Sequence, residues 1–472
     1  MRYYPPAMGR ARAFPGNPRA LPPRVKYPAL KPYRRAPPIH GTSVRTGLSI
    51  NTLIVGLMLL AVISTLTLSA GMLAHWKIHY LTNGGGFYEK LHPTTYFTVL
   101  AFFLLLIRHG NPIGELDRMF SRSKLLIAYL LCWAFLFVQV VVLKRPFTVI
   151  IDTFLLPVLL CLVMWQLTPQ QKKPLVWAFH LMILLNIVIG YYEYFSGHRL
   201  IPLTLGDIVV VGEWRSSALL GHPLTASGLI AGYILALVLR PSLCPPLVVR
   251  VPLIGFSLGS LMAFGGRTAL VTVLAVIGLL AARELLRMLR GGQAPLLAVI
   301  GAMCLLAAAG AVIFAALDAG IFDKMLLRFS SDKGSALARF ATFDLLSHFD
   351  WHELLLGPNV ARVNALQMQL GLNYGIENFW ISSIAQFGII HTTVLTLGLL
   401  GLFTEIIKRS VPAIWAIILL ILMIAASSVS FSSKNIQLAQ FIILITLLLP
   451  RERAFTTKPT QLRSAIKFAP VT

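Results

Sequence analysis

Long apolar runs are the feature that most limits how this chain can fold. They recur along most of its 472 residues, of which 57% are hydrophobic and only 12% are charged. A soluble domain carries about 25% charged residues. A run of about 17 or more apolar residues is long enough to cross the hydrocarbon of a bilayer as one helix. The sequence therefore predicts an all-α, polytopic integral membrane protein.

The apolar runs predict about twelve transmembrane helices. Their expected ranges are 48–74, 94–107, 124–143, 147–167, 174–195, 224–240, 247–264, 268–285, 295–317, 379–407, 412–428 and 435–450. Together they form a transmembrane domain over residues 48–450, which we expect to be catalytic for reasons given below.

Basic residues set the expected orientation. The net charge is +24, and residues 1–47 contain ten Lys and Arg residues with no acid. This proline-rich segment has no packing pattern, so we expect a disordered cytoplasmic tail. Residues 451–472 form a second basic cytoplasmic tail. Basic flanks beside apolar spans favour membrane lipids as partners and argue against a nucleic-acid ligand.

Twelve spans and two cytoplasmic tails place the odd-numbered connections on the outer side. One of these, residues 318–378, is about 60 residues long and contains the amphipathic stretch ALARFATFDLLSHF. Loops of this length are usually functional. We expect one or two helices of this loop to lie over the outer surface.

Several arginines break the positive-inside rule by falling on the expected outer side. Arg267 lies in the tight hairpin FGGRTAL, and Arg215 lies where a loop re-enters the membrane. Guanidinium groups match phosphate oxygens bidentately and stay charged, so these residues suit a lipid-linked phosphate at the membrane surface. The alternative is that each arginine pairs with a loop carboxylate or snorkels to lipid headgroups.

The segment GIENFW places Glu377 and Asn378 directly before the apolar run at 379–407. A carboxylate at the expected outer boundary of a span, near the outward-facing arginines, favours a functional role for Glu377. The alternative is helix chemistry, because Asn is a good N-cap and an acid favours the positive end of a helix.

Polar residues inside the spans have simpler interpretations. His180 and Asn186 are expected to make hydrogen bonds between helices, and Asp152 is expected to pair with Lys144 or Arg145. The run HFDWHE at 348–353 has two histidines four residues apart but lacks a zinc-protease pattern, so we expect no metal site.

The order of three motifs resembles the O-antigen ligase and O-antigen polymerase superfamily of bacterial envelope glycosyltransferases. An arginine-bearing stretch is followed by GHPLTASG, then by GGRTAL, then by a large outer loop that ends in EN before a span. The resemblance covers about residues 205 to 405. It implies a GT-C-like membrane enzyme in the bacterial inner membrane that acts at the periplasmic face.

The resemblance implies a donor saccharide on undecaprenyl pyrophosphate, an acceptor hydroxyl, and no metal or other cofactor. Carried over to this sequence, Arg215 and Arg267 would bind the pyrophosphate, Arg339 could complete the cluster, and His222 borders the same site. Ligases of this superfamily have a histidine, taken as the base or the orienting residue for the acceptor hydroxyl, where this chain has Glu377. The resemblance implies that Glu377 accepts the proton of this hydroxyl and that Asn378 orients it. The departure favours a polymerase of O-antigen or exopolysaccharide repeats, and a chain-length regulator would then be a plausible partner.

Two alternatives remain open. One is a ligase that transfers the lipid-linked glycan to a lipid or protein acceptor. The other is a transporter or flippase, for which matching halves and charges near the middle of the membrane are expected. The charges of this chain gather at the outer ends of the spans, and the long loop has no counterpart in the first half. These features favour the enzyme.

Overall fold

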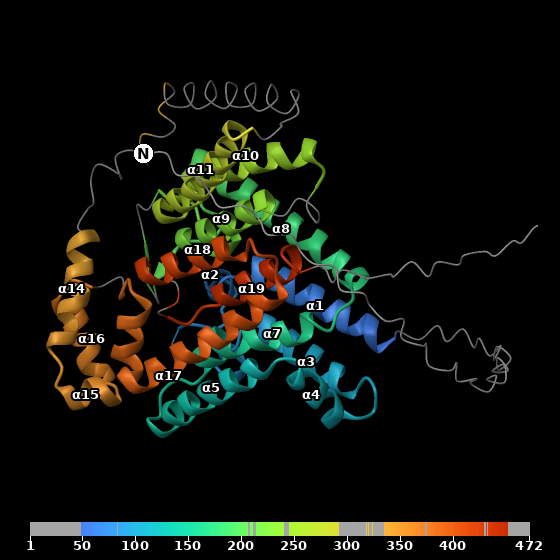
Figure 1. The fold of residues 1–472 in the computed structure, drawn as a ribbon. Helices are drawn as coiled ribbons and strands as arrows, with labels where there is room; N and C mark the ends of the chain where they lie inside the picture. Colours follow the sequence, from blue (N-terminus) through green and yellow to red (C-terminus); the bar gives the residue numbers. More distant parts are fainter. Residues whose placement is uncertain are drawn as a thin grey trace, which may run out of the picture. The chain divides into compact units, whose positions relative to one another are not determined.

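The computed structural model describes residues 49–451 except 83, 206–207, 211–213, 240–244, 292–317, 319, 321–322, 324–334, 373–374, 429–430 and 432. The chain divides into two units, Met1–Gly47 and Leu48–Thr472. The first unit, most of the C-terminal tail and the expected span 295–317 lie outside the described residues. Within the described part the protein is almost entirely α-helical, as Figure 1 shows.

The first half of the described chain contains α1 (Ile50–Thr67), α2 (Ala70–His75), α3 (Pro93–Ile107), α4 (Pro112–Ser121), α5 (Lys124–Val142), α6 (Thr148–Ile150), a π-helical turn (Ile151–Leu155), α7 (Leu156–Met164) and α8 (Pro169–Ser196). The second half contains α9 (Pro223–Leu239), α10 (Leu247–Phe264), α11 (Arg267–Leu289), α14 (Ser335–Ser347), α15 (Trp351–Leu356), α16 (Val360–Gln369), α17 (Phe379–Arg409), α18 (Ile414–Ser427) and α19 (Gln437–Leu448). A short antiparallel pair, β1 (Thr204–Leu205) and β2 (Ile208–Val209), lies between α8 and α9.

Each expected span that falls in the described residues contains a helix, although several differ in detail. Among the described residues, five helices are long and apolar enough to cross a membrane, or six if the bent pair α3 and α4 is one span, and five further apolar helices are shorter. The expected span 48–74 is divided because Ser69 caps a second helix. These apolar helices indicate a multi-pass membrane protein.

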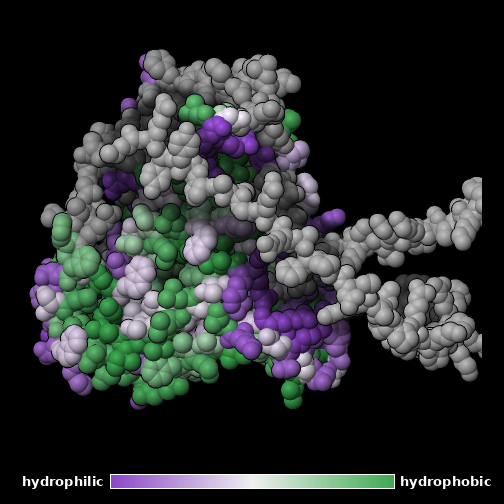
Figure 2. All heavy atoms as spheres, in the orientation of Figure 1, coloured by the Kyte–Doolittle hydropathy of each residue, from purple (hydrophilic) through white to green (hydrophobic). Residues whose placement is uncertain are grey.

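The surface of the bundle supports this conclusion. Large apolar side chains such as Leu131 and Val142 of α5, Trp177 of α8 and Leu279 of α11 are each more than two-thirds exposed. Figure 2 shows a broad hydrophobic surface over α5 and α17, with hydrophilic side chains gathered mainly beside it. Contiguous apolar surface on this scale requires a non-aqueous environment or a partner.

Some connections that the predicted order of spans assigns to the cytoplasmic side contact one another. The guanidinium of Arg409, at the end of α17, donates to the carbonyl of Arg122 and lies 4.0 Å from the ring centroid of Trp165. Ser410 and Pro450 form an isolated β-bridge. Helix ends that the sequence places on one side are therefore neighbours in the fold.

A kink in α17 holds the long loop that precedes this helix. Gly388 has φ +82° in the middle of this helix, and Gly357, which ends α15, has φ +102°. A Cβ on Gly388 would lie 2.5 Å from the backbone nitrogen of Gly357, so the two backbones pack without room for a side chain. Gln139 of α5 donates to the carbonyls of Leu356 (2.8 Å) and Phe387 (2.9 Å), which joins both segments to the bundle.

The long loop that precedes α17 has a small core of its own. Helix α14 covers the stretch that the sequence marked as amphipathic, and α15 and α16 follow it (Figure 1). A separate core joins the loop to the first turns of α17. It contains Leu345, Phe349, Val363, Leu372, Ile376, Ile381 and Ala385. The segment that leads to Glu377 is therefore fixed by the loop as well as by α17.

Candidate functional site

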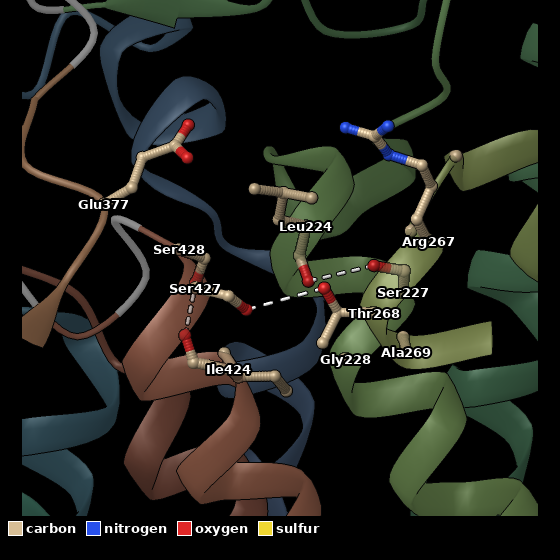
Figure 3. Close-up of a pocket in the computed structure, with 12 residues that line it drawn as sticks. Leu224, Ser227, Gly228, Arg267, Thr268, Ala269, Glu377, Ile424, Ser427 and Ser428 are labelled. Atoms are coloured by element: carbon tan, nitrogen blue, oxygen red, sulfur yellow. Dashed lines mark hydrogen bonds between the residues drawn. The ribbon is translucent and has the colours of Figure 1, made fainter. Parts of the chain in front are cut away.

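A polar pocket lies where several helix ends meet. Its lining comes from the first turns of α9 and α11, the last turn of α18 and the segment before α17, and its cavity volume is about 70 Å³. The lining residues are Leu224, Ser227, Gly228, Gly265, Gly266, Arg267, Thr268, Ala269, Glu377, Ile424, Ser427 and Ser428. Figure 3 shows Arg267 and Glu377 on opposite sides of this pocket. Two candidates from distant parts of the sequence thus share one cavity.

The glycine pair before Arg267 makes this arrangement possible. Gly265 ends α10 in the left-handed region at φ +64°, and the N–H of Leu270 donates to the carbonyl of Gly266 as α11 begins. A Cβ on Gly265 would lie 2.7 Å from Cδ of Arg215. Glycine is therefore required there both by the turn and by the arginine packed against it.

Arg215 lies beside the same hairpin although it does not line the pocket. Its stem packs on Gly265, and the N–H of the next residue, Ser216, donates to the carbonyl of Ala263 (3.1 Å). The hydroxyl of Ser216 donates to the carbonyl of Gly190 (2.6 Å), and Arg199 donates to the carbonyl of Arg215. The structure therefore brings Arg215 and Arg267 to the two sides of one tight turn.

Glu193 of α8 positions the loop that carries Arg215. Its carboxylate is buried and accepts the N–H groups of Ser217 and Ala218, both at 2.9 Å, and that of Leu200 at 3.2 Å. Ala218 has φ +48°, which is unfavourable for a residue with a Cβ. The carboxylate therefore holds a loop conformation that the local sequence would not choose alone.

Asn186 makes a second attachment of this loop. Its side-chain oxygen accepts the N–H of Leu219 (3.1 Å), and its amide donates to the carbonyl of Leu66 in α1 (3.0 Å). Nδ1 of His180 forms a hydrogen bond of 2.7 Å with the hydroxyl of Tyr233 in α9. Both expected hydrogen bonds between helices are confirmed.

Asn378 caps α17. Its side-chain oxygen accepts the N–H groups of Trp380 (3.0 Å) and Ile381 (3.1 Å). The capping interpretation therefore describes Asn378, which is absent from the pocket lining, whereas the half-buried Glu377 beside it lines the pocket. By capping the first turn of α17, Asn378 fixes the backbone next to Glu377 and so the position of Glu377 in the pocket lining.

His222 also makes a turn. Its Nδ1 accepts the N–H of Leu224 (3.2 Å), and its carbonyl accepts the N–H of Ala226 (3.0 Å) at the start of α9. His222 therefore shapes the turn that begins α9, and it is not in the pocket lining. Arg339 lies on α14, but its side chain lies outside the described residues, so its expected place in the cluster stays a prediction.

The side of the pocket that carries Arg267 is suited to an anion. Helices α9 and α11 present their N-terminal turns to it, and the N-terminus of a helix carries partial positive charge and N–H groups without intrahelical partners. Hydroxyl groups of Ser227, Thr268 and Ser427 add polar atoms, and the hydroxyls of Ser427 and Thr268 lie 3.5 Å apart. With Arg267, this surface can stabilise a phosphate group.

Asp152 does not have the partners that the sequence suggested. Its carboxylate is fully buried and accepts the N–H of His92 (3.1 Å) and the hydroxyl of Thr95 (2.6 Å). Arg145 instead donates to the carbonyl of Pro358 (3.0 Å). The expected pairing was wrong because the π-helical turn at 151–155 directs Asp152 toward α3 rather than toward its own loop.

The histidines of HFDWHE belong to loop structure in the described residues. His348 bonds through Nδ1 to the carbonyl of Asp344 (2.9 Å). Asp350 and Glu353 form a capping box at the start of α15, and Glu353 accepts from Arg362 at 2.6 Å. No group of three His, Cys, Asp or Glu side chains able to hold a metal ion is found within the part of the chain that the structure describes.

Sequence inspection missed Glu193 and the pocket hydroxyls. An acid in an apolar span, as in YYEYFSG, was a usable signal for Glu193, because intramembrane carboxylates are rare and need partners. The serines and threonines gave no such signal, since these residues also occur in ordinary helix contacts.

No protein-family model matches the sequence, and no curated protein matches it.

Proposed function

We propose that this protein is a glycosyltransferase that polymerises oligosaccharide repeats carried on undecaprenyl pyrophosphate. The reaction takes place at the periplasmic face of a bacterial inner membrane. The observation that carries the proposal is that Arg267 and Glu377 line one pocket at the ends of apolar helices. A cation for a leaving phosphate and a carboxylate for an attacking hydroxyl are the two groups that this reaction needs.

The chemistry follows from these two positions. An acceptor hydroxyl attacks the anomeric carbon of the donor sugar, a new carbon–oxygen bond forms, and the bond to the diphosphate breaks. The diphosphate leaves with the electron pair, while Glu377 takes the proton of the hydroxyl. Charge grows on the leaving group, so Arg267, the N-terminus of α11 and the nearby Arg215 stabilise the transition state more than the bound donor. No metal is needed in this scheme, because guanidinium supplies the positive charge.

The size of the pocket limits what enters it. A volume of about 70 Å³ has room for a phosphate group or one edge of a sugar ring. It is far too small for an entire lipid-linked repeat. The lipid chain and the remaining sugars would therefore lie outside, along the membrane and over the outer loop. This arrangement, with the diphosphate–sugar junction in the pocket and the remaining sugars outside it, suits an enzyme that binds this junction and extends a polymer.

Polymerase is favoured over ligase by Glu377, which stands where ligases of the resembling superfamily have histidine. Transport is the less favoured alternative. The pocket lies at helix ends, whereas a transporter places its substrate near the middle of its helices.

The decisive experiment compares variants in cells that make the polysaccharide and in purified protein. Arg267→Ala and Glu377→Gln should each lower transfer by a factor on the order of 100 to 1,000. Arg287→Ala is the matched control, because Arg287 lies at the other end of α11 in an exposed pair with Glu284. Thermal unfolding of each variant shows whether the fold is retained.

The products separate the alternatives. Accumulation of single lipid-linked repeats in Arg267→Ala and Glu377→Gln supports a polymerase. Accumulation of long lipid-linked polymer supports a ligase. Full transfer in both variants, with folded protein present, contradicts a glycosyltransferase site in this pocket.

A further inference from the structure

Gln437 is a buried amide directly behind the pocket. It is the first residue of α19 and is 1% exposed. Among the described residues neither its Nε2 nor its Oε1 has a hydrogen-bond partner. Gln440, one turn later, differs because its Nε2 donates to the carbonyl of Thr65 (3.0 Å), so that only its Oε1 is without a partner among the described residues. A buried amide with both polar atoms unpaired destabilises a fold, so its presence calls for a ligand or an ordered water.

The amide reaches the floor of the pocket at Gly228. A Cβ on Gly228 would lie 3.1 Å from Nε2 of Gln437 and 2.8 Å from Cδ1 of Ile424. Gly228 and Ile424 both line the pocket, and Figure 3 shows the two at its lower end. Because Gly228 has no side chain, a rotation of Ile424 is a small change that would open the floor toward the amide.

The chemistry of the amide selects the kind of group that fits. A phosphate oxygen only accepts hydrogen bonds, so it would satisfy Nε2 and leave Oε1 unpaired. A hydroxyl group both donates and accepts, so it can satisfy both atoms of Gln437. Arg267, at the upper side of the pocket, is already suited to the phosphate.

We propose that the carboxamide of Gln437 binds a hydroxyl group of the donor sugar at the base of the pocket. This inference rests on the proposed function and deepens it, because it places the sugar below the diphosphate and makes Gln437 a determinant of sugar specificity. Ile424 then acts as the side chain that covers the amide until a sugar is bound.

The test uses the full-length protein with Gln437→Met, which keeps the shape of the side chain and removes both polar atoms. Gln440→Met is the matched control on the same helix. For Gln437→Met we expect a thermal midpoint equal to or above that of the wild type, because an unpaired amide is removed. Its kcat/KM should nevertheless fall about tenfold, the loss of one or two uncharged hydrogen bonds. Gln440→Met should unfold at a lower temperature and keep the kinetics of the wild type.

A binding measurement isolates the sugar. Undecaprenyl diphosphate with and without one attached oligosaccharide repeat is added to each purified variant, and the shift in thermal midpoint is recorded. In the wild type the attached sugar should add to the shift, and in Gln437→Met this addition should disappear while the shift from the diphosphate stays. If Gln437→Met is not recovered folded, Gln437→Leu is measured in its place.

The outcomes separate this inference from the proposed function. If Gln437→Met gains stability and keeps wild-type kinetics and sugar binding, the amide holds a buried water only and the inference is wrong. If Arg267→Ala still transfers sugar at the wild-type rate, the proposed function is wrong, and the inference that rests on it is wrong as well. Loss of transfer in Arg267→Ala with normal sugar recognition in Gln437→Met overturns the inference alone.

Discussion

The two ends of the helical bundle use carboxylates differently. At the end that the sequence assigns to the cytoplasm, Glu115 pairs with Arg118 and lies 3.5 Å from Arg108, and Glu405 pairs with Lys408 and Arg409 at 3.6 and 3.7 Å. At the opposite end, Glu193 and Asp152 accept backbone N–H groups. Most of these ion pairs join residues one turn apart on the same helix, whereas carboxylates bonded to the backbone fix the path of a loop.

This difference matters for the candidate site. A diphosphate pocket needs guanidinium groups held in place before the substrate arrives. The loop that Glu193 holds carries Arg215, and the glycine turn packed against it carries Arg267. The outer end is therefore expected to be sensitive to single changes, and the inner end to be tolerant.

Glu193→Ala should have the largest effect. It leaves the buried N–H groups of Ser217 and Ala218 and the part-buried N–H of Leu200 without their acceptor, which we expect to destabilise the fold by about 3–5 kcal/mol and to abolish transfer. Glu193→Gln retains one acceptor oxygen and should fall between this variant and the wild type. Thermal unfolding and a transfer assay check both. A stable, active Glu193→Ala would remove the proposed role of this carboxylate.

Gly388→Ala comes next. A Cβ there meets the backbone of the outer loop at 2.5 Å, and the residue has φ +82°, so a cost of about 2–4 kcal/mol is expected. Gly401→Ala on the same helix is the control, because its Cβ would make only ordinary contact, at 3.4 Å or more. Alanine is a better helix former than glycine, so this control should be neutral or stabilising. Equal effects of the two changes would contradict the kink as drawn.

Glu115→Gln tests the tolerant end. Glu115 is 4% exposed, but its partners Arg108 and Arg118 reach solvent, so we expect a loss of about 1–2 kcal/mol and wild-type transfer. Urea unfolding at low and high salt measures the loss. A loss as large as that of Glu193→Ala would erase the proposed difference between the two ends.

The smallest effect concerns Glu89, in the connection between α2 and α3. This carboxylate accepts the N–H of His79 (3.0 Å), bonds to its ring and accepts the N–H of Gly86, which lowers the pKa of Glu89 to about 2. Because the pKa of Glu89 is lowered in the folded state, its ionised carboxylate stabilises the fold at pH values above the ordinary pKa near 4.5. This contribution to stability is lost as the pH falls toward 2. The protection factor of the His79 N–H, which is the exchange rate of an unstructured peptide at the same pH divided by that of this N–H, should therefore fall as the pH is lowered from 4.5 toward 2 in the wild type and be low at all these pH values in Glu89→Gln. A pH-independent protection factor in the wild type would contradict this.

Hydropathy predicted the helices well because the length and composition of a span are set by the bilayer alone. It also predicted α14 from its amphipathic pattern. Hydropathy does not record which helices touch, so counting spans placed Arg267 and Glu377 on one side without showing that they share a pocket. The contacts of Gln139 with Leu356 and Phe387, and of Gly357 with Gly388, join segments far apart in the sequence. The π-helical turn that redirects Asp152 is likewise a product of tertiary packing.

Binding of undecaprenyl diphosphate to purified protein tests the central claim most directly. If Arg267 holds the diphosphate and Glu377 activates the acceptor, Arg267→Ala should bind this lipid at least tenfold more weakly, whereas Glu377→Gln should bind it as the wild type does and yet fail to transfer sugar. Wild-type binding by Arg267→Ala, or equal loss of binding in both variants, would contradict the division of roles across the pocket.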